Sequence, residues 1–562
     1  MKVAELLEEL KRRKMARRGL LYLVVAWVVI QVLDIVFPAL NVPDWAMSMV
    51  VVLLIVGFPV ALVLAWMFES PADIAQGRRR SERPSRSERR EGQEDGDAPR
   101  SIAVLPFVNL SDDKENEYFS DGMTEEILNA LAKVPELRVA SRTSSFAFKG
   151  MAKDVLDIAD ELRVDTVVEG SVRKAGDRVR VTAQLISADD GYQLWSETYD
   201  GGLEDIFRLQ DEIARSIVDA LKIELVGAGA PLVEPETEDV DAYTHYLKGR
   251  FFFYRFQQDD LQRSLEQYQE ALKHDPEYGR AYAGIADTWM QLADDWVPPE
   301  ESYPEAKAAA QKAIALDESL AEAHTALGKV YGWFEWDFDR AELALRRAVA
   351  ANPRYPDAHW GLGSILPPNG QLAGAIDEMR TALKLDPLSP VFSYFLARFL
   401  MFAGRLDEAV EQSRRTEELD PTSFRSLQVL GQCQLLAGEP GAALQLFRRA
   451  HDVSGVVSVN AYIARALADL AREDEARELL ERVEAGDDYV RSEFMAAAWG
   501  ALGELDRAFD ALETALTARS AGLIYCHVDP AYDTLWGDPR FDDVASRIGL
   551  KREEPTGSAP RT

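Results

Sequence analysis

The sequence contains few of the residues on which disulfide frameworks and metal centres depend. Its 562 residues include two cysteines, Cys433 and Cys526, and only six histidines. Two cysteines cannot build a disulfide framework, and they lack the spacing of a structural zinc site. The histidines are scattered and do not form the paired helical spacing of a zinc hydrolase. We therefore expect no metal, and we predict that both cysteines pack between helices.

Sequence motifs of common active sites are also missing. The chain has no glycine-rich phosphate loop, no dinucleotide-binding glycine fingerprint and no nucleophile elbow. Acidic residues are abundant, but no pattern marks any of them as catalytic. From the sequence alone we therefore predict that the chain is not an enzyme and that it carries no cofactor.

Positive charge is scarce beyond the first hundred residues. The net charge is −32, and residues 101–562 hold 48 basic against 82 acidic residues. A surface with this balance repels the phosphate backbone of nucleic acids. We therefore expect no nucleic-acid partner, and we attribute the excess of acidic residues to solubility.

Two long apolar runs near the amino terminus contrast with the polar remainder. They cover 19–40 and 46–68, and each is long enough to cross about 30 Å of hydrocarbon. Seven Lys or Arg residues precede the first run, seven arginines follow the second, and the short loop between them has none. Because positive flanks stay inside, we predict a two-helix transmembrane hairpin over 19–68. The expected location is the bacterial inner membrane, with the amino terminus and the soluble domains in the cytoplasm.

The two apolar runs contain one charged residue, Asp34. An ionisable group within a span suggests a functional site. The alternative is that Asp34 lies near the outer interface and forms hydrogen bonds with polar neighbours such as Gln31. On either side of the hairpin, we predict a basic amphipathic segment over 1–18 and a disordered, arginine-rich linker over 69–100.

Residues 101–227 predict a mixed α/β domain. A short apolar strand over 101–107 is followed by a helix over 120–134, which begins with capping and acidic residues. An alternating stretch then reverses at Gly176 and again near Gly191, as in a strand meander. An amphipathic helix over 203–226 closes the domain.

Several motifs of this domain resemble the TolB amino-terminal-like family, which is related to the FlgO and CsgG-type envelope domains. The resemblance is carried by SIAVLPFVNLSDDKENEYFSDGMTEEILNAL, VASRTSSFAFKG, VVEGSVRKAGDRVRVTAQLI and QLWSETYD. In bacterial proteins of this kind, such a domain often precedes a tetratricopeptide (TPR) array, and some carry an adenylate cyclase or a winged-helix module. The resemblance implies a fold and a context, but no reaction.

Within those motifs, Ser141, Arg142 and Ser144 follow a predicted strand. They are candidates for an anion-binding or partner-binding site. The alternative is a hydrogen-bonded turn that fixes the segment after the strand.

The remaining chain repeats itself with a period of 34. Prolines, glycines and alanines recur at this spacing in Pro353, Pro387 and Pro421, in Gly370 and Gly404, and in Ala375 and Ala409. Small residues at helix crossings and a proline at the exit are typical of TPR repeats. We predict a linker over 228–240, an all-α TPR solenoid of about eight helix pairs over 241–524, a cap over 525–550 and a disordered tail over 551–562.

Four tryptophans of the array are candidates for lining a peptide groove, because aromatic side chains contribute much of the energy of protein interfaces. The alternative is that they pack where helices cross. The four are Trp289, Trp333, Trp336 and Trp360.

The complete sequence thus predicts a multidomain chain with a transmembrane hairpin, a TolB-like α/β domain and a TPR solenoid. The predicted function is that of a membrane-anchored, non-enzymatic scaffold or signalling adaptor that binds proteins through its repeats. The alternative is a small-molecule sensor in which the TolB-like domain binds a ligand and signals through the array. The sequence identifies no partner and leaves open whether the chain forms a homo-oligomer.

Overall fold

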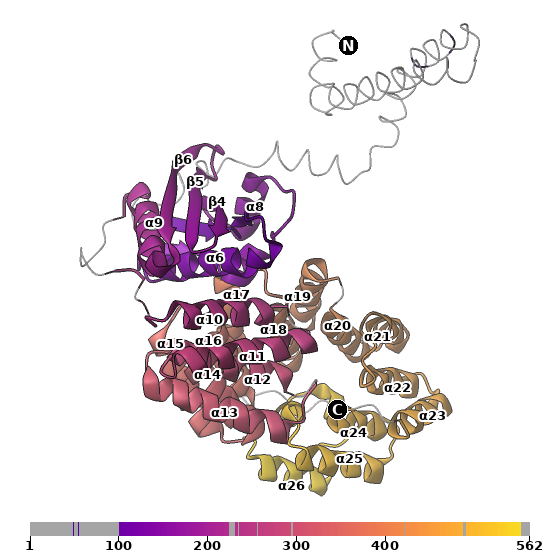
Figure 1. Cartoon of the computed structure of the whole chain (residues 1–562). Coiled ribbons are helices and arrows are strands. Elements are labelled where there is room, and N and C mark those ends of the chain that lie inside the picture. Colours follow the sequence, from indigo (N-terminus) through magenta and orange to yellow (C-terminus); the bar gives the residue numbers. More distant parts are fainter. Residues whose placement is uncertain are drawn as a thin grey trace, which may run out of the picture. The chain divides into compact units, whose positions relative to one another are not determined.

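A computed structural model describes Met49, Leu54 and residues 100–551 except 224–230, 234, 236, 256, 294–295, 422 and 487–489. The described chain is drawn in colour in Figure 1. Residues 1–98 and 99–562 form two separate units, and nearly everything described belongs to the second.

The predicted fold class began with a transmembrane hairpin, and the structure corrects this part of the prediction. In the described part of the chain, no helix is both long enough and apolar enough to cross a membrane. The predicted hairpin over 19–68, with Gln31 and Asp34, lies outside the described residues except for Met49 and Leu54. The structure instead shows an α/β domain followed by a helical repeat region, and it does not support a two-span inner-membrane protein.

The α/β domain is built on one mixed sheet with the strand order β3-β1-β4-β5-β6, and β2 also pairs with β4. Strand β1 runs parallel to β3 and β4, whereas β4, β5 and β6 form an antiparallel meander. Gly176 has a φ of 58° in the tight turn between β4 and β5, a conformation that glycine adopts readily. The strands are β1 (Arg100–Val104), β2 (Val108–Asn109), β3 (Leu137–Val139), β4 (Thr166–Ala175), β5 (Arg178–Ser187) and β6 (Gln193–Gly202).

Helices cover both faces of this sheet (Figure 1). Helices α6 (Glu117–Ala132) and α9 (Ile206–Ala220) share one core with the inward side chains of β5, namely Val179, Val181, Ala183 and Leu185. These alternate residues face one side because the side-chain period of a strand is two. Helix α8 (Val155–Leu162) forms a smaller core on the other face.

Within the described residues, the repeat region consists of eight antiparallel helix pairs. The first helices of the pairs are α10 (Val240–Phe253), α12 (Gly279–Leu292), α14 (Ala321–Lys329), α16 (Pro356–Ile365), α18 (Pro390–Phe402), α20 (Phe424–Leu436), α22 (Val459–Asp469) and α24 (Ser492–Ala501). The second helices are α11 (Gln258–His274), α13 (Pro299–Leu316), α15 (Phe338–Ala351), α17 (Leu372–Leu385), α19 (Leu406–Leu419), α21 (Pro440–Ser454), α23 (Glu473–Glu484) and α25 (Leu505–Thr517).

Small residues allow the two helices of a pair to approach closely. A Cβ atom on Gly431 of α20 would lie 2.3 Å from the Phe447 ring on α21. Prolines such as Pro390 and Pro440 stand at the first helical position, where the missing N–H is tolerated. The repeat pattern read from the sequence therefore has a direct steric basis.

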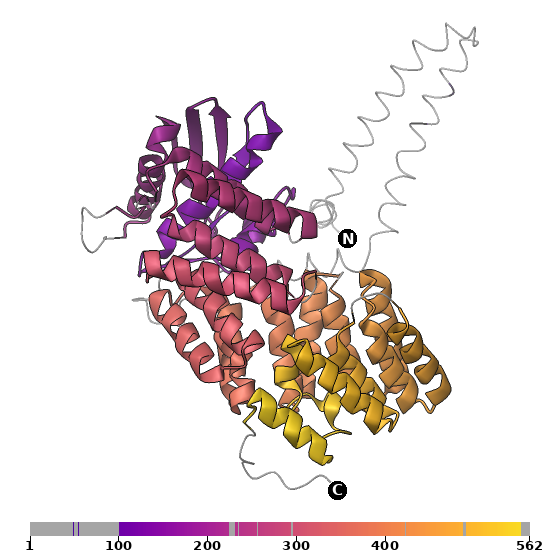
Figure 2. The same cartoon turned by 60° about the horizontal axis from the view of Figure 1, so that its bottom comes forward.

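Neighbouring first helices pack against one another, for example α12 on α14, α14 on α16 and α22 on α24. This packing places the first helices together on one side of the repeat array, which we call the inner face. Figure 2 shows the pairs stacked side by side. The chain ends with the short helices η5 (Ala521–Tyr525) and η6 (Pro530–Tyr532), followed by α26 (Pro539–Ile548), which packs on α25.

Candidate functional site

The α/β domain docks on the inner face through buried ion pairs. Glu125 of α6 accepts hydrogen bonds from Arg142 of its own domain, at 2.9 Å, and from Arg250 of α10, at 3.0 Å from Nε. Burial would raise the pKa of the Glu125 carboxyl, but the guanidinium groups of Arg250 and Arg142 outweigh it and lower that pKa. This carboxylate is therefore charged and compensated in the fold.

A second contact joins the turn after α6 to the repeats. The guanidinium of Arg354, between α15 and α16, donates to the main-chain oxygens of Ala132, Val134, Pro135 and Leu137. The last carbonyls of a helix have no partner within the helix. Arg354 therefore bonds one such carbonyl, that of Ala132, and three carbonyls of the turn that follows α6.

The predicted site residues Ser141, Arg142 and Ser144 also contact the repeats. The Ser141 side chain caps the short helix α7 (Arg142–Phe146) by accepting from the Ser144 N–H. The buried Ser144 hydroxyl donates to the Asp386 carboxylate and accepts from the Leu388 N–H at 3.0 Å. The structure thus brings the three residues together and engages them within the chain.

Two more details define this contact. The Arg142 guanidinium lies 3.4 Å from the centre of the Tyr254 ring at the end of α10. Burial raises the pKa of the Asp386 carboxyl, while the hydroxyls of Ser144, Ser141 and Thr143 partly offset that rise. The docking interface is therefore polar as well as buried.

Of the four candidate tryptophans, the structure brings Trp333 and Trp360 together. Their rings meet edge to face at 5.7 Å, and the Trp333 N–H donates to the Ser364 hydroxyl at 3.2 Å. Trp289 packs against the same small core as Trp333, around Tyr303. The three side chains are partly buried where helices cross.

Trp336 lies apart from this group. It follows a π-helical turn, Val330–Phe334, and has a φ of 57°. The Arg519 guanidinium, from the start of the carboxy-terminal segment, lies 5.0 Å from its ring centre. Trp336 therefore marks a contact between the third repeat pair and the end of the chain.

A charged group that was not predicted from the sequence lies beside Trp360. The Lys329 ammonium lies 3.8 Å from the Trp360 ring centre, and only 7% of Lys329 is exposed. Burial lowers the pKa of Lys329, and Asp357 and Asp287 oppose this effect. Burial also raises the pKa of Asp287 to about 7, with Lys329 as the main opposing charge.

A signal for this group was present in the sequence. The ninth residue of five successive first helices is polar, although each of these helices is largely apolar. Aligning the repeats on their helix starts places these residues in one row of the inner face. They are Asp287, Lys329, Ser364, Arg398 and Gln432.

The chain's own carboxy-terminal segment covers the other part of the inner face. The Tyr525 hydroxyl donates to the Ser364 main-chain oxygen at 2.8 Å. Arg398 forms a buried ion pair with Asp529 at 3.3 Å. Burial raises the pKa of Asp529, and Arg398 opposes this rise. Residues from η5 to η6 are therefore a fixed part of the array.

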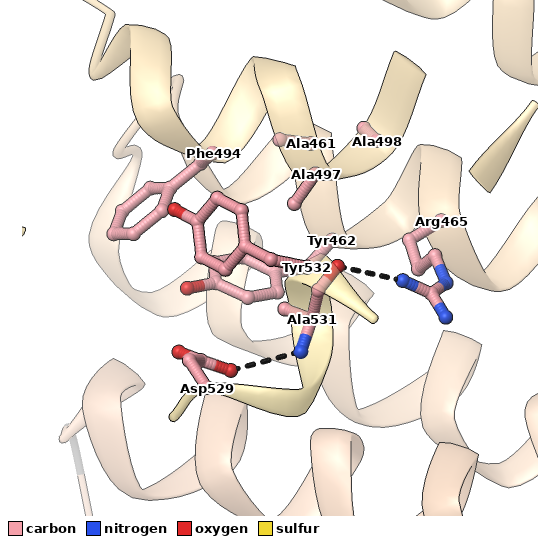
Figure 3. Close-up of a pocket in the computed structure, with 9 residues that line it drawn as sticks. All are labelled: Ala461, Tyr462, Arg465, Phe494, Ala497, Ala498, Asp529, Ala531 and Tyr532. Atoms are coloured by element: carbon pink, nitrogen blue, oxygen red, sulfur yellow. Dashed lines mark hydrogen bonds between the residues drawn. The ribbon is translucent and has the colours of Figure 1, made fainter. Parts of the chain in front are cut away.

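A small cavity lies between this segment and the helices α22 and α24 (Figure 3). Its volume is about 20 Å³, and Tyr462, Phe494 and Tyr532 contribute aromatic walls. Across it, the Arg465 guanidinium donates to the Ala531 main-chain oxygen at 2.9 Å. A space of this size holds a single water molecule, so it is not a ligand pocket.

One group in the described residues has ligand atoms close enough to hold a metal ion. It consists of Asp239, Asp241 and His274, whose ligand atoms lie within 4.8 Å of one another. All three are exposed, and Asp239 already caps α10 by accepting from the Ala242 N–H at 2.8 Å. The positive end of the helix dipole opposes a cation there.

Comparison with protein families identifies two kinds of domain. Residues 98–216 match the second domain of HilA/YgeH-like transcriptional regulators. Residues 337–390 and 369–433 match tetratricopeptide repeat models. The carboxy-terminal region therefore contains TPR repeats, as predicted. The TolB-like resemblance of 101–227 stays a prediction.

Two curated relatives are informative. The chain is 38% identical over 247 residues to "Putative adenylate cyclase 3" of Rhizobium meliloti, covering 43% of this chain and 42% of that protein. It is 22% identical over 292 residues to "Transcriptional regulator HilA" of Salmonella typhimurium, covering 51% of each. The chain thus spans about half the length, or less, of these relatives.

The first of these similarities contradicts the prediction that the chain is not an enzyme. A relative of this identity is named a cyclase, so absent motifs do not exclude catalysis. The prediction rested on short local patterns, which are a weak basis for a negative conclusion.

Solved structures with TPR folds align with parts of the repeat region. YrrB, described as a TPR protein with an unusual peptide-binding site, is 22% identical, covers 34% of this chain and 94% of its own, and has a TM-score of 0.26. TTC0263 of Thermus thermophilus is 20% identical, covers 34% and 99%, and has a TM-score of 0.30. These likenesses carry no argument about function.

Proposed function

We propose that the chain is a protein-interaction scaffold in which the TPR region holds the α/β domain as a fixed module and presents it to a protein partner. TPR proteins commonly serve as interaction scaffolds. The observation that carries the proposal is the docking of the α/β domain by buried, charge-compensated contacts, with Glu125 between Arg142 and Arg250.

This arrangement changes where a partner can bind. Ser144 and Asp386 are engaged with each other, and Tyr525 and Asp529 cover the inner face near α16 and α18. Much of the inner face is therefore occupied by the chain itself. We propose that the partner contacts the presented α/β domain together with the uncovered part of the inner face.

We also propose that the output is signalling. The relatives that share parts of this chain are named as a putative adenylate cyclase and as a transcriptional regulator. Both names refer to signalling or regulation, which supports this proposal. In this proposal the α/β domain and the repeats form the receiving module.

The test is affinity purification of the full chain followed by quantitative mass spectrometry. Glu125→Leu leaves Arg250 and Arg142 without their carboxylate and is expected to loosen the docked domain. A partner of the presented module should be depleted at least fivefold with this variant. The matched control is Glu478→Leu, which removes an exposed ion pair with Arg482 on α23, outside the α/β domain, and should retain the partner.

Two results would contradict the scaffold proposal. One is the absence of any partner enriched reproducibly with the wild-type chain. The other is equal recovery of all partners with Glu125→Leu, provided that hydrogen exchange shows the α/β domain released from the repeats. In that case docking would not matter for binding.

A second candidate function is nucleotide cyclisation, and it rests on the 38% identity to the putative adenylate cyclase. The purified full chain would be incubated with ATP and Mg²⁺ or Mn²⁺, and cyclic AMP would be measured. Turnover above a heat-treated sample would support this candidate. No cyclic AMP with either metal would leave the scaffold as the better description.

A further inference from the structure

We infer that the contact between the turn after α6 and the repeats is sensitive to pH, and that His359 of α16 controls it as a positioning residue for Arg354. The Arg354 guanidinium holds this turn by donating to four main-chain oxygens between Ala132 and Leu137. His359 holds the peptide bond directly before Arg354. The inference concerns a contact within the chain, so it does not depend on the proposed scaffold function.

Both ring nitrogens of His359 face oxygen atoms. Nδ1 lies 2.7 Å from Glu378 Oε2 on α17, and Nε2 lies 3.0 Å from the Pro353 main-chain oxygen. A carboxylate and a carbonyl only accept hydrogen bonds, and a neutral imidazole has a single N–H to donate. Both contacts are therefore satisfied together only by the imidazolium form, which donates from each nitrogen.

The surroundings favour this charged form. His359 is buried, and burial lowers the pKa of its imidazole. The hydrogen bonds to Glu378 and to the Pro353 oxygen outweigh burial, so the pKa of His359 is raised above its ordinary value. The ring therefore keeps its proton to a higher pH than a histidine in water.

One charged group acts on this ring, and it is Glu378 of α17. Helices α14 and α15 also pack on α16, but their charged residues have other partners. Lys329 of α14 interacts with Asp357. Arg346 of α15 forms an ion pair with Glu342 at 2.7 Å. Protonation of the ring is therefore controlled by one carboxylate and one carbonyl.

Loss of the proton to solvent releases the Pro353 contact. A hydrogen bond to a carboxylate is stronger than one to a neutral carbonyl, so the remaining N–H stays on Nδ1, toward Glu378. The lone pair of Nε2 then faces the Pro353 oxygen, and the two acceptors repel each other. The peptide bond before Arg354 loses its support, and the guanidinium loses its fixed direction toward the turn after α6.

The preceding repeat has a histidine in the same place. His324 is the fourth residue of α14, as His359 is of α16. Its Nε2 lies 3.0 Å from the Glu318 main-chain oxygen. One N–H of a neutral imidazole satisfies this bond, so this histidine needs no charge.

The two repeats differ at the positions that the inference uses. Ala344 of α15 stands 34 residues before Glu378 and occupies the same repeat position. Ser319 stands five residues before its histidine, where the next repeat has Arg354. The carboxylate that retains the proton and the arginine that is positioned by it therefore occur together, in the repeat whose loop reaches α6.

The experiment measures hydrogen exchange of the full chain between about pH 6 and about pH 9. Rates are converted to protection factors, which removes the intrinsic effect of pH on exchange. Because the folded pKa of His359 is raised, the contact is complete below about pH 6.5 and is lost as the pH rises through the folded pKa. We expect protection over 130–140 to fall by about tenfold across this range, as for the loss of a charge-assisted hydrogen bond.

His359→Gln should show low protection over 130–140 at every pH, without this fall, because an amide side chain does not titrate. His324→Gln is the matched control and should show the same fall as the wild type. Asp287 titrates in all three proteins, so the difference between them isolates His359. A histidine with only a structural role would change the level of protection but not its dependence on pH.

Glu378→Gln is a second, conservative variant that keeps the histidine and removes the carboxylate. It should move the fall to lower pH, and it tests the inference even where His359→Gln does not fold. The inference is overturned if protection over 130–140 in the wild type is independent of pH, if His359→Gln shows the same fall, or if Glu378→Gln leaves the midpoint unchanged. None of these results depends on recovery of a partner, so this inference and the scaffold proposal can fail separately.

Discussion

The Arg280 guanidinium on α12 lies 3.0 Å from the Glu126 carboxylate on α6. The two side chains belong to different domains and are only 16% and 10% exposed. Glu125, the adjacent residue, binds Arg250 of α10. Two consecutive carboxylates of one helix are therefore held by two successive repeat pairs, which couples the stability of the α/β domain to that of the array.

Replacing Glu125 with glutamine should destabilise the chain by about 3 kcal/mol, because removing one partner leaves buried charge uncompensated. Here the uncompensated groups are the guanidiniums of Arg142 and Arg250. The measurement is the free energy of unfolding in urea. Glu212→Gln, which removes an exposed pair with Arg208, should change it by less than about 0.5 kcal/mol. An equal effect of the two substitutions would contradict the docking role of Glu125.

Arg354→Ala should release the end of α6 from the repeats. The variant loses hydrogen bonds to four main-chain oxygens, including those of Val134 and Leu137, and we expect a loss of about 2 to 4 kcal/mol. Hydrogen exchange should accelerate over 130–140 before the repeats are affected. The exposed Arg347→Ala on α15 is the control. Unchanged exchange over 130–140 would show that these bonds contribute little.

Asp287 should make the chain less stable as the pH rises. Its pKa in the fold is about 7 because of burial, above the ordinary value of about 3.9. The unfolded state therefore ionises first, and stability falls between about pH 4 and pH 7. Asp287→Asn should be more stable than the wild type by about 4 kcal/mol at pH 8 and nearly equal to it at about pH 4. Parallel pH profiles of the two proteins would contradict the assignment.

Gly431→Ala should destabilise the sixth repeat pair. The added methyl group would meet the buried Phe447 ring at 2.3 Å, and overpacking of this kind costs about 1 to 3 kcal/mol. Gly441→Ala, on the facing helix α21, is the matched control, because nothing lies within 4 Å of its added Cβ. Thermal unfolding should show a lower Tm for the first variant and an equal or higher Tm for the second.

Local patterns in the sequence were sufficient for the repeats and for the strand meander. The spacing of 34 places Gly431 and Ala443 where helices cross, and both are buried at such a crossing. The turn at Gly176 is likewise determined locally, because its positive φ is a conformation that glycine adopts readily. In both cases the deciding interactions join residues that are near in the chain, so the sequence carries their signal.

The candidate site was predictable only in part. Trp333 and Trp360 were identified as candidates, and they do meet. Lys329 and Asp287 were not, although a polar ninth residue recurs in the first helices, because only the stacking of these helices shows that the recurring residues form one row. The non-enzyme prediction failed for a different reason, since the absence of short motifs says little about a chain with a relative named as a cyclase.

By itself, the sequence determined that helices would pair, where they would cross and that an α/β domain would precede them. Only the tertiary structure decided that Ser144 would bind Asp386 and that Tyr525 would reach Ser364. These pairs are separated by 242 and 161 residues, and no local periodicity encodes them. They form because the stacking of the helix pairs brings segments that are distant in the sequence into contact. Polar groups that become buried in such a contact need hydrogen-bond partners, and the adjacent segment supplies them.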